Sequence, residues 1–125
     1  RLAITYQGKT VTLWAKADTG CALREPFSGL PVIVCQASAL TPLLPSGAGE
    51  GLPGEGFRLV PFESVGGAGM LPAFRPDSVR LEPAGTSLAC YVALWQRGPA
   101  GPGFPAGDFQ ALYGPDQFPE LSPTR

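Results

Sequence analysis

The sequence predicts a single all-β domain with one or two short helices, and three observations support this fold class. Short alternating or β-branched runs recur along the 125 residues, and no long helical period separates them. Glycine and proline account for 32 residues, about a quarter of the chain, and punctuate these runs as turns. Hydrophobic residues make up 44% and the net charge is only −1, which is enough apolar material for one core. We therefore expect a small barrel or sandwich.

The first elements predict a hairpin followed by a buried strand. Residues 4–6 lead through a Gln7-Gly8-Lys9 turn into residues 11–17, where the apolar side chains share one face at period two. This second strand ends at Asp18-Thr19-Gly20. Residues 30–35 form a mostly apolar run with a β-branched centre, which favours a buried strand. Residues 37–44 are compatible with one helical turn.

The second half of the chain continues the same pattern. Residues 57–62 and 70–74 are strand candidates around a mobile, glycine-rich turn at 64–69. Residues 79–82 alternate, and residues 88–95 predict a strong strand. Residues 109–113 form a last apolar segment that ends at Gly114-Pro115.

Two stretches concentrate the glycine and proline residues. They lie at about 42–57 and 98–107, where 8 of 16 and 7 of 10 residues are of these types. Such a composition is typical of flexible or extended segments. We therefore expect one domain over residues 1–125 with two flexible inserts, and a tail that frays from about residue 119.

The composition excludes several classes of function. The chain has no histidine, which removes Ser-His-Asp and Cys-His catalysis and every zinc site that needs histidine. The spacing of Cys21, Cys35 and Cys90 fits no metal or redox pair, so we interpret them as reduced, buried thiols and expect no metal or cofactor. A pI near 5.3 without a basic cluster argues against nucleic acid. The sequence contains no run of 18 or more apolar residues, so it predicts no membrane-spanning helix within residues 1–125.

Asp18-Thr19-Gly20 is the motif that carries chemistry. Without histidine, an enzyme must use carboxylates, lysines or tyrosines as acid–base groups. A carboxylate in a turn packed on a core is partly desolvated, and its pKa can be shifted. The alternative is an ordinary turn, because all three residue types are favoured there.

The position of this triplet at the end of a hairpin strand resembles the active-site loop of aspartic proteases. In that family a glycine-rich flap follows, and an apolar-apolar-Gly triplet comes near the end. Residues 64–69 and 112–114 occur here in the same order. The resemblance implies a retropepsin-like acid protease barrel that forms one lobe of a two-fold dimer.

A longer signature narrows the resemblance. The sequence DTGCALREP at 18–26, with GLPV at 29–32, resembles the motif of the sporulation sigma-E factor processing peptidase family. Residues 61–66 and 75–79 are also similar to family blocks, so the resemblance covers roughly residues 2–95 and, more weakly, residues 109–118. It implies a pro-sigma-E-type precursor as the substrate. It also implies a membrane-spanning region upstream of residue 1 and a location at the cytoplasmic face of the cell membrane.

The resemblance also implies which residues form the site. It implies catalytic roles for Asp18, Thr19 and Gly20. It implies substrate-binding roles in the flap for Ser64, Val65, Gly66 and Gly67. The chemistry needs two carboxylates that face one water and share one proton. Because the chain has one Asp-Thr-Gly and no room for a second lobe, we expect a homodimer in which two copies of Asp18 meet at a two-fold axis.

Lys16 and Cys21 depart from the family pattern. Cys21 stands where the sigma-E processing family commonly has asparagine, and Lys16 stands where many aspartic proteases are apolar. An ammonium near the two carboxylates would disturb the shared proton. Lys16 directed at the carboxylates would therefore favour a non-catalytic retropepsin-like module for dimerisation or peptide binding, whereas Lys16 directed at solvent favours the protease. A retropepsin-like protease of unrelated biology is a third alternative. Glu25 is interpreted as a structural or solvent-facing residue.

Overall fold

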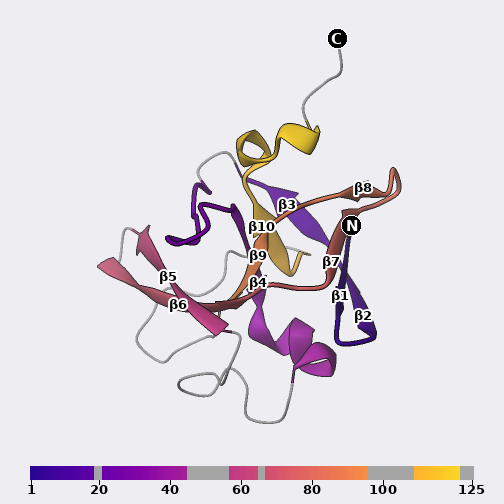
Figure 1. The fold of residues 1–125 in the computed structure, drawn as a ribbon, viewed down its shortest axis with the longest axis horizontal. Coiled ribbons are helices and arrows are strands. Elements are labelled where there is room, and N and C mark those ends of the chain that lie inside the picture. Colours follow the sequence, from indigo (N-terminus) through magenta and orange to yellow (C-terminus); the bar gives the residue numbers. More distant parts are fainter. Residues whose placement is uncertain (19–20, 45–56, 65–66, 96–108, 122–125) are drawn as a thin grey trace.

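A computed structural model describes residues 1–18, 21–44, 57–64, 67–95 and 109–121. Within these ranges the chain forms ten strands and three short 3-10 helices, so the all-β prediction is confirmed. The strands form two open sheets (Figure 1). No closed barrel is found among the described strands.

The smaller sheet contains four antiparallel strands in the order β2-β1-β7-β8. Its strands are β1 (Leu2–Tyr6), β2 (Lys9–Leu13), β7 (Ser78–Leu81) and β8 (Thr86–Ser87). The predicted turn between β1 and β2 is confirmed, with positive φ angles at Gln7 and Gly8. The Gln7 N–H donates to the Asp77 carboxylate at 2.8 Å, which holds the turn against β7.

The larger sheet contains six strands in the order β3-β10-β4-β9-β6-β5. The β3–β10 and β4–β9 pairs are parallel and the other pairs are antiparallel. Its strands are β3 (Ala15–Ala17), β4 (Val32–Gln36), β5 (Phe57–Ser64), β6 (Gly67–Phe74), β9 (Tyr91–Trp95) and β10 (Ala111–Tyr113).

The strand predicted over residues 11–17 is divided at Trp14, where the chain passes from the smaller sheet to the larger one. The Trp14 N–H donates to the Gln110 side-chain carbonyl at 3.0 Å. The Trp14 carbonyl accepts the Gln110 N–H at 2.8 Å. The backbone groups of Trp14 are therefore satisfied by the segment that enters β10, and Asp18 comes directly after β3.

The helices are η1 (Ala37–Leu43), η2 (Pro115–Gln117) and η3 (Pro119–Leu121). The helical turn predicted at 37–44 is confirmed as 3-10 helix. Helix η3 lies at the start of the tail that we expect to fray from about residue 119, and the Glu120 carboxylate there accepts the Ala89 N–H at 3.1 Å. The fraying of the tail stays a prediction. Residues 122–125 and most of the two glycine- and proline-rich stretches lie outside the described residues.

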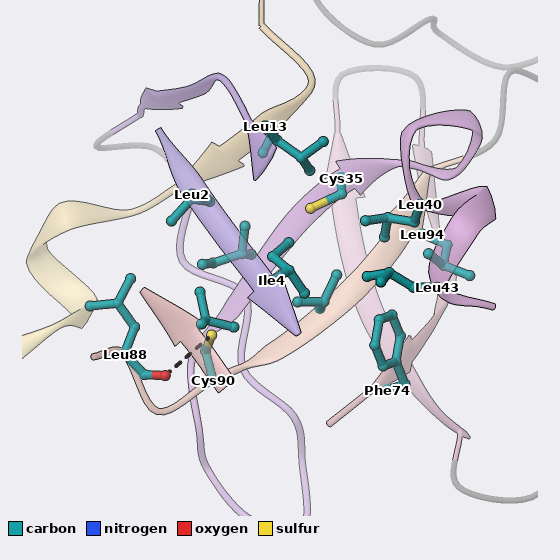
Figure 2. Packing of buried hydrophobic residues seen from close by; sticks show 14 of the residues in the cluster. Leu2, Ile4, Leu13, Cys35, Leu40, Leu43, Phe74, Leu88, Cys90 and Leu94 are labelled. Atoms are coloured by element: carbon teal, nitrogen blue, oxygen red, sulfur yellow. Dashed lines mark hydrogen bonds between the residues drawn. The ribbon is translucent and has the colours of Figure 1, made fainter. Parts of the chain in front are cut away.

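Strands β4 and β9 lie at the centre of the larger sheet and are buried on both faces. Alternate residues point into two different clusters. The large core covers one face and includes the ten residues labelled in Figure 2. The small core covers the other face and consists of Val32, Val34, Val60, Leu71, Ala73 and Ala93. Burial on both faces explains the continuous apolar runs at these strands in the sequence.

The β5–β6 hairpin pairs eight residues of each strand and extends away from the rest of the sheet (Figure 1). Only Ala73 and Phe74 of β6 also pair with β9. The pairing stops at Pro72, which has no N–H to donate to a neighbouring strand. The hairpin is longer than predicted, because Ser64 and Gly67 belong to strands rather than to a turn at 64–69.

Candidate active site

Asp18 lies where the ends of β3 and β10 meet. Its N–H donates to the Tyr113 carbonyl at 2.8 Å, and its carbonyl accepts the Cys21 N–H at 2.9 Å. Asp18 is half-buried. These bonds fix the backbone on both sides of the predicted turn, whose residues Thr19 and Gly20 lie outside the described ranges.

The apolar-apolar-Gly triplet lies next to this turn. Leu112 pairs with Lys16 and Tyr113 with Ala17 in the parallel β3–β10 ladder. A Cβ atom at Gly114 would collide with the Cys21 carbonyl oxygen, so only glycine allows this close backbone approach. The structure therefore brings together two motifs that lie about 90 residues apart in the sequence.

Cys21 connects the turn to the small core. Its side chain is half-buried and packs against that cluster. Burial raises the pKa of the Cys21 thiol, the Leu23 N–H opposes this rise, and the negative charge of Asp18 adds to it. The thiol is therefore neutral at pH 7.

Lys16 is directed to the surface. The side chain is exposed, and its Nζ atom lies 5.4 Å from the centre of the Phe109 ring. This distance is typical of a cation–π contact.

Glu25 holds the loop that follows the turn. The side chain is only 1% exposed, and its carboxylate accepts the N–H groups of Phe27 at 3.1 Å and Ser28 at 2.7 Å. Hydrogen bonds from Ser28, the side-chain bond first, lower the pKa of Glu25 despite the opposing effect of burial. Of the two roles expected for Glu25, the structure agrees with the structural one and not with the solvent-facing one.

Three further carboxylates belong to other parts of the fold. Asp77 accepts a backbone N–H of the β1–β2 turn, and Glu120 accepts one from the segment before β9. The Glu82 Oε1 atom lies 3.9 Å from the Arg80 Nε atom, as an ion pair at the surface. Among the described residues, no three histidine, cysteine, aspartate or glutamate side chains group together as metal ligands would.

The β5–β6 hairpin covers the small core with its inner face. Val60 and Leu71 are buried there, and the Phe62 ring meets the Trp95 ring edge-on at 5.5 Å. Gly69 lies opposite Phe62, and an added Cβ would come within 2.8 Å of that ring. Of the predicted flap residues, Ser64 is the last residue of β5 and Gly67 the first of β6, and Val65 and Gly66 lie outside the described residues.

Gln117 contacts the same region but was not singled out from the sequence. Its side-chain Nε2 donates to the Leu23 carbonyl at 2.9 Å. A glutamine after Gly114-Pro115 carries no local signal that would link it to residues near position 20. Only the fold reveals this contact.

The fold and the site describe a small β domain in which one aspartate-bearing turn lies beside a hairpin over an apolar cluster. Residues 1–97 match the model of the peptidase U4 family, described as sporulation factor SpoIIGA, so the class of protein is a peptidase. The chain belongs to this SpoIIGA family of sigma-E processing peptidases, which confirms the resemblance found in the motifs. No curated protein and no solved structure matches the chain. The described part of the chain contains no helix with the length and apolar character needed to cross a membrane.

Proposed function

We propose that this domain is an aspartic endopeptidase that acts as a homodimer and activates a sporulation sigma-factor precursor of the pro-sigma-E type. Family membership supports a peptidase that processes sigma-E. The observation that carries the aspartic mechanism is the position of Asp18. It follows β3, its backbone is bound to Tyr113 of β10, and Cys21 links its turn to the small core.

The second carboxylate is proposed to come from a second copy of the chain. Glu25 is occupied by two backbone N–H groups, and Asp77 and Glu120 each accept a backbone N–H elsewhere. Asp18 of a symmetric partner would supply the missing group at a two-fold axis. A retropepsin-like lobe that pairs in this way is consistent with one Asp-Thr-Gly per chain.

The proposed mechanism uses one ionised and one protonated Asp18, because two carboxylates a few Å apart do not both ionise easily. The ionised carboxylate removes a proton from water as the water oxygen attacks the peptide carbonyl. The protonated carboxylate donates a hydrogen bond to that carbonyl, and a proton then passes to the leaving nitrogen. Thr19 and Gly20 are proposed to lock and close the turn.

The position of Lys16 supports the protease over the non-catalytic alternative. The ammonium is exposed beside Phe109, so its charge lies largely in water and has little effect on a carboxylate pair. The reason for preferring a non-catalytic module for dimerisation or peptide binding is thereby weakened.

The substrate is proposed to bind as an extended strand beneath the hairpin. Ser64, Val65, Gly66 and Gly67 would contact its main chain from the hairpin end. We further propose that a membrane-spanning region upstream tethers the domain to the cytoplasmic face of the membrane, where the precursor is cleaved.

Substitution of Asp18 tests the aspartic mechanism. Full-length Asp18→Asn, expressed with the precursor, should reduce cleavage by at least about a hundredfold, the lower range for loss of an acid–base group. Asp77→Asn is the matched control, because Asp77 lies on the smaller-sheet side and its replacement can still accept the Gln7 N–H. Cleavage by Asp18→Asn at the wild-type rate would refute the mechanism.

Mixed expression tests the homodimer. If two Asp18 residues form one site, equal amounts of wild-type and Asp18→Asn chains leave about a quarter of randomly formed dimers active. The activity per wild-type chain should therefore fall to about half. Activity that stays proportional to the wild-type chain would show that each chain acts alone, and sedimentation in detergent reports the oligomeric state directly.

A further inference from the structure

The contact between Gln117 and Leu23 joins the C-terminal part of the domain to the segment after Asp18. The two residues are separated by 94 positions, and the Gln117 Nε2 lies 2.9 Å from the Leu23 carbonyl oxygen. The same carbonyl accepts the Val32 N–H at 3.1 Å. Leu23 is therefore held from two sides, by the start of β4 and by η2.

Gln117 is itself fixed next to the turn. Its N–H donates to the Gly114 carbonyl at 3.0 Å, so η2 follows directly on the glycine whose backbone lies against Cys21. Gly114 contacts residue 21 and Gln117 binds residue 23. Gly114 and Gln117 therefore hold the segment that follows the Asp18 turn.

The burial of Gln117 indicates that its side-chain amide has a structural role. The residue is only 8% exposed, and its Oε1 has no hydrogen-bond partner in the described part of the chain. A buried polar atom without a partner costs free energy, whereas an apolar side chain of similar length would fill the space without that cost. Among the described residues, the bond from Nε2 to the Leu23 carbonyl is the one hydrogen bond that this side-chain amide makes.

We infer that Gln117 is a positioning residue for the Asp18 carboxylate, an inference that rests on the proposed function of Asp18. It acts through the backbone of residues 21–23, which its amide holds at a fixed distance from β10. Two such turns must meet correctly at the two-fold axis to share one proton. A small displacement of reacting groups can lower the rate by about a hundredfold. Loss of the Gln117 amide should therefore lower kcat and leave KM nearly unchanged.

Gln117→Met in the full-length protein tests the inference, because methionine keeps the length of the side chain and removes the donor. We expect kcat to fall by about tenfold or more with KM within about twofold and the unfolding midpoint preserved. Gln110→Met is the matched control. Gln110 also binds backbone through its amide, at Trp14, and its replacement should leave kcat within about twofold. A wild-type kcat in Gln117→Met overturns the inference.

Gln117→Glu provides a second readout that packing alone does not move. A glutamic acid side chain can donate to the Leu23 carbonyl only when it is protonated. The ratio of its kcat to the wild-type kcat should therefore rise as the pH is lowered from 7 to 5. A constant ratio overturns the inference even if Gln117→Met does not fold.

The Asp18→Asn variant separates the two proposals. If it cleaves normally, the proposed aspartic mechanism is wrong and the role of Gln117 is wrong with it. If it is inactive while Gln117→Met retains its kcat and Gln117→Glu shows a constant ratio, only the positioning role is wrong.

Discussion

The two faces of the β4–β9 pair differ in the size of the apolar cluster that covers them. Among the described residues, the large core on one face contains fifteen buried residues, and the small core on the other contains six. The large core is closed by the smaller sheet and η1, as Figure 2 illustrates around Ile4 and Leu40. The small core is covered by the β5–β6 hairpin and bordered by half-buried Cys21, Phe62 and Trp95.

Because side chains alternate along β4 and β9, neighbouring residues point into different cores, and we expect one core to matter mainly for stability and the other mainly for activity. Ile33 and Cys35 point into the large core, whereas Val32 and Val34 point into the small core. The large core contains no charged side chain and supplies most of the buried apolar area. The small core contacts the Asp18 turn through Cys21. A substitution on one face should therefore change stability most, and a substitution on the other should change activity most.

The largest expected effect on stability comes from Phe74→Ala in the large core. Phe74 is fully buried, and its ring lies 4.7 Å from that of Tyr6 and 5.6 Å from that of Phe57. Its loss should reduce the free energy of unfolding by about 3–5 kcal/mol, measured by urea denaturation. Val60→Ala in the small core removes less apolar area and should cost about 2 kcal/mol. Equal costs would contradict the comparison.

A smaller effect, mainly on activity, is expected from Phe62→Ala. Phe62 faces the small core and Trp95, and truncation leaves the hairpin without its inner aromatic contact. We expect kcat/KM for precursor cleavage to fall by about tenfold, as for the loss of apolar contact in a substrate site. Leu59→Ala is the matched control, because Leu59 is 43% exposed and lies on the opposite face of the same strand. If both variants cleave the precursor with equal kcat/KM, the inner face of the hairpin does not contribute to cleavage.

The smallest effect concerns the three thiols. Burial raises the pKa of Cys90 to about 12 and that of Cys35 still further, so neither should react with iodoacetamide in the folded protein. Cys21 is half-buried and should be alkylated slowly, with a rate that still rises above pH 9 because its pKa is raised. Mass spectrometry of the native protein should find the label on Cys21 alone.

The same reaction reports the charge of Asp18. Because the carboxylate adds to the raised pKa of Cys21, Asp18→Asn should lower that pKa and speed alkylation at pH 8. An unchanged rate would indicate that the carboxylate does not act on the sulfur.

The elements that depend on local signals were predicted well from the sequence. The Gln7-Gly8 turn, the buried run at β4 and the 3-10 turn after it all follow from neighbouring residues. Elements that depend on pairing with distant segments were not predicted from the sequence. The break at Trp14 arises because the chain changes sheets, and β8 is a two-residue strand that pairs with β7 and with no other described strand. The strand predicted at 88–95 begins at Tyr91, where pairing with Val32 begins.

The candidate site shows the same division. Asp18 and residues 112–114 were predicted because each carries a recognisable motif in a fixed order. The sequence left a structural and a solvent-facing role open for Glu25, and only the folded loop shows that its carboxylate is buried and accepts two N–H groups. Gln117 was not predicted, because its role depends on the approach of η2 to Leu23 and on no pattern in its own neighbourhood.

The position of β10 has a consequence for how the domain is made. This strand is the last of the described strands along the chain, yet it lies inside the sheet, between β3 and β4. Strand β3 therefore joins the larger sheet only after residues 111–113 have left the ribosome and inserted. Pairing between segments so distant in sequence is slow, because a long loop must close first. Asp18 thus acquires its backbone partner Tyr113 only after residues 111–113 have been made, and a chain that stops before them lacks this contact at the turn.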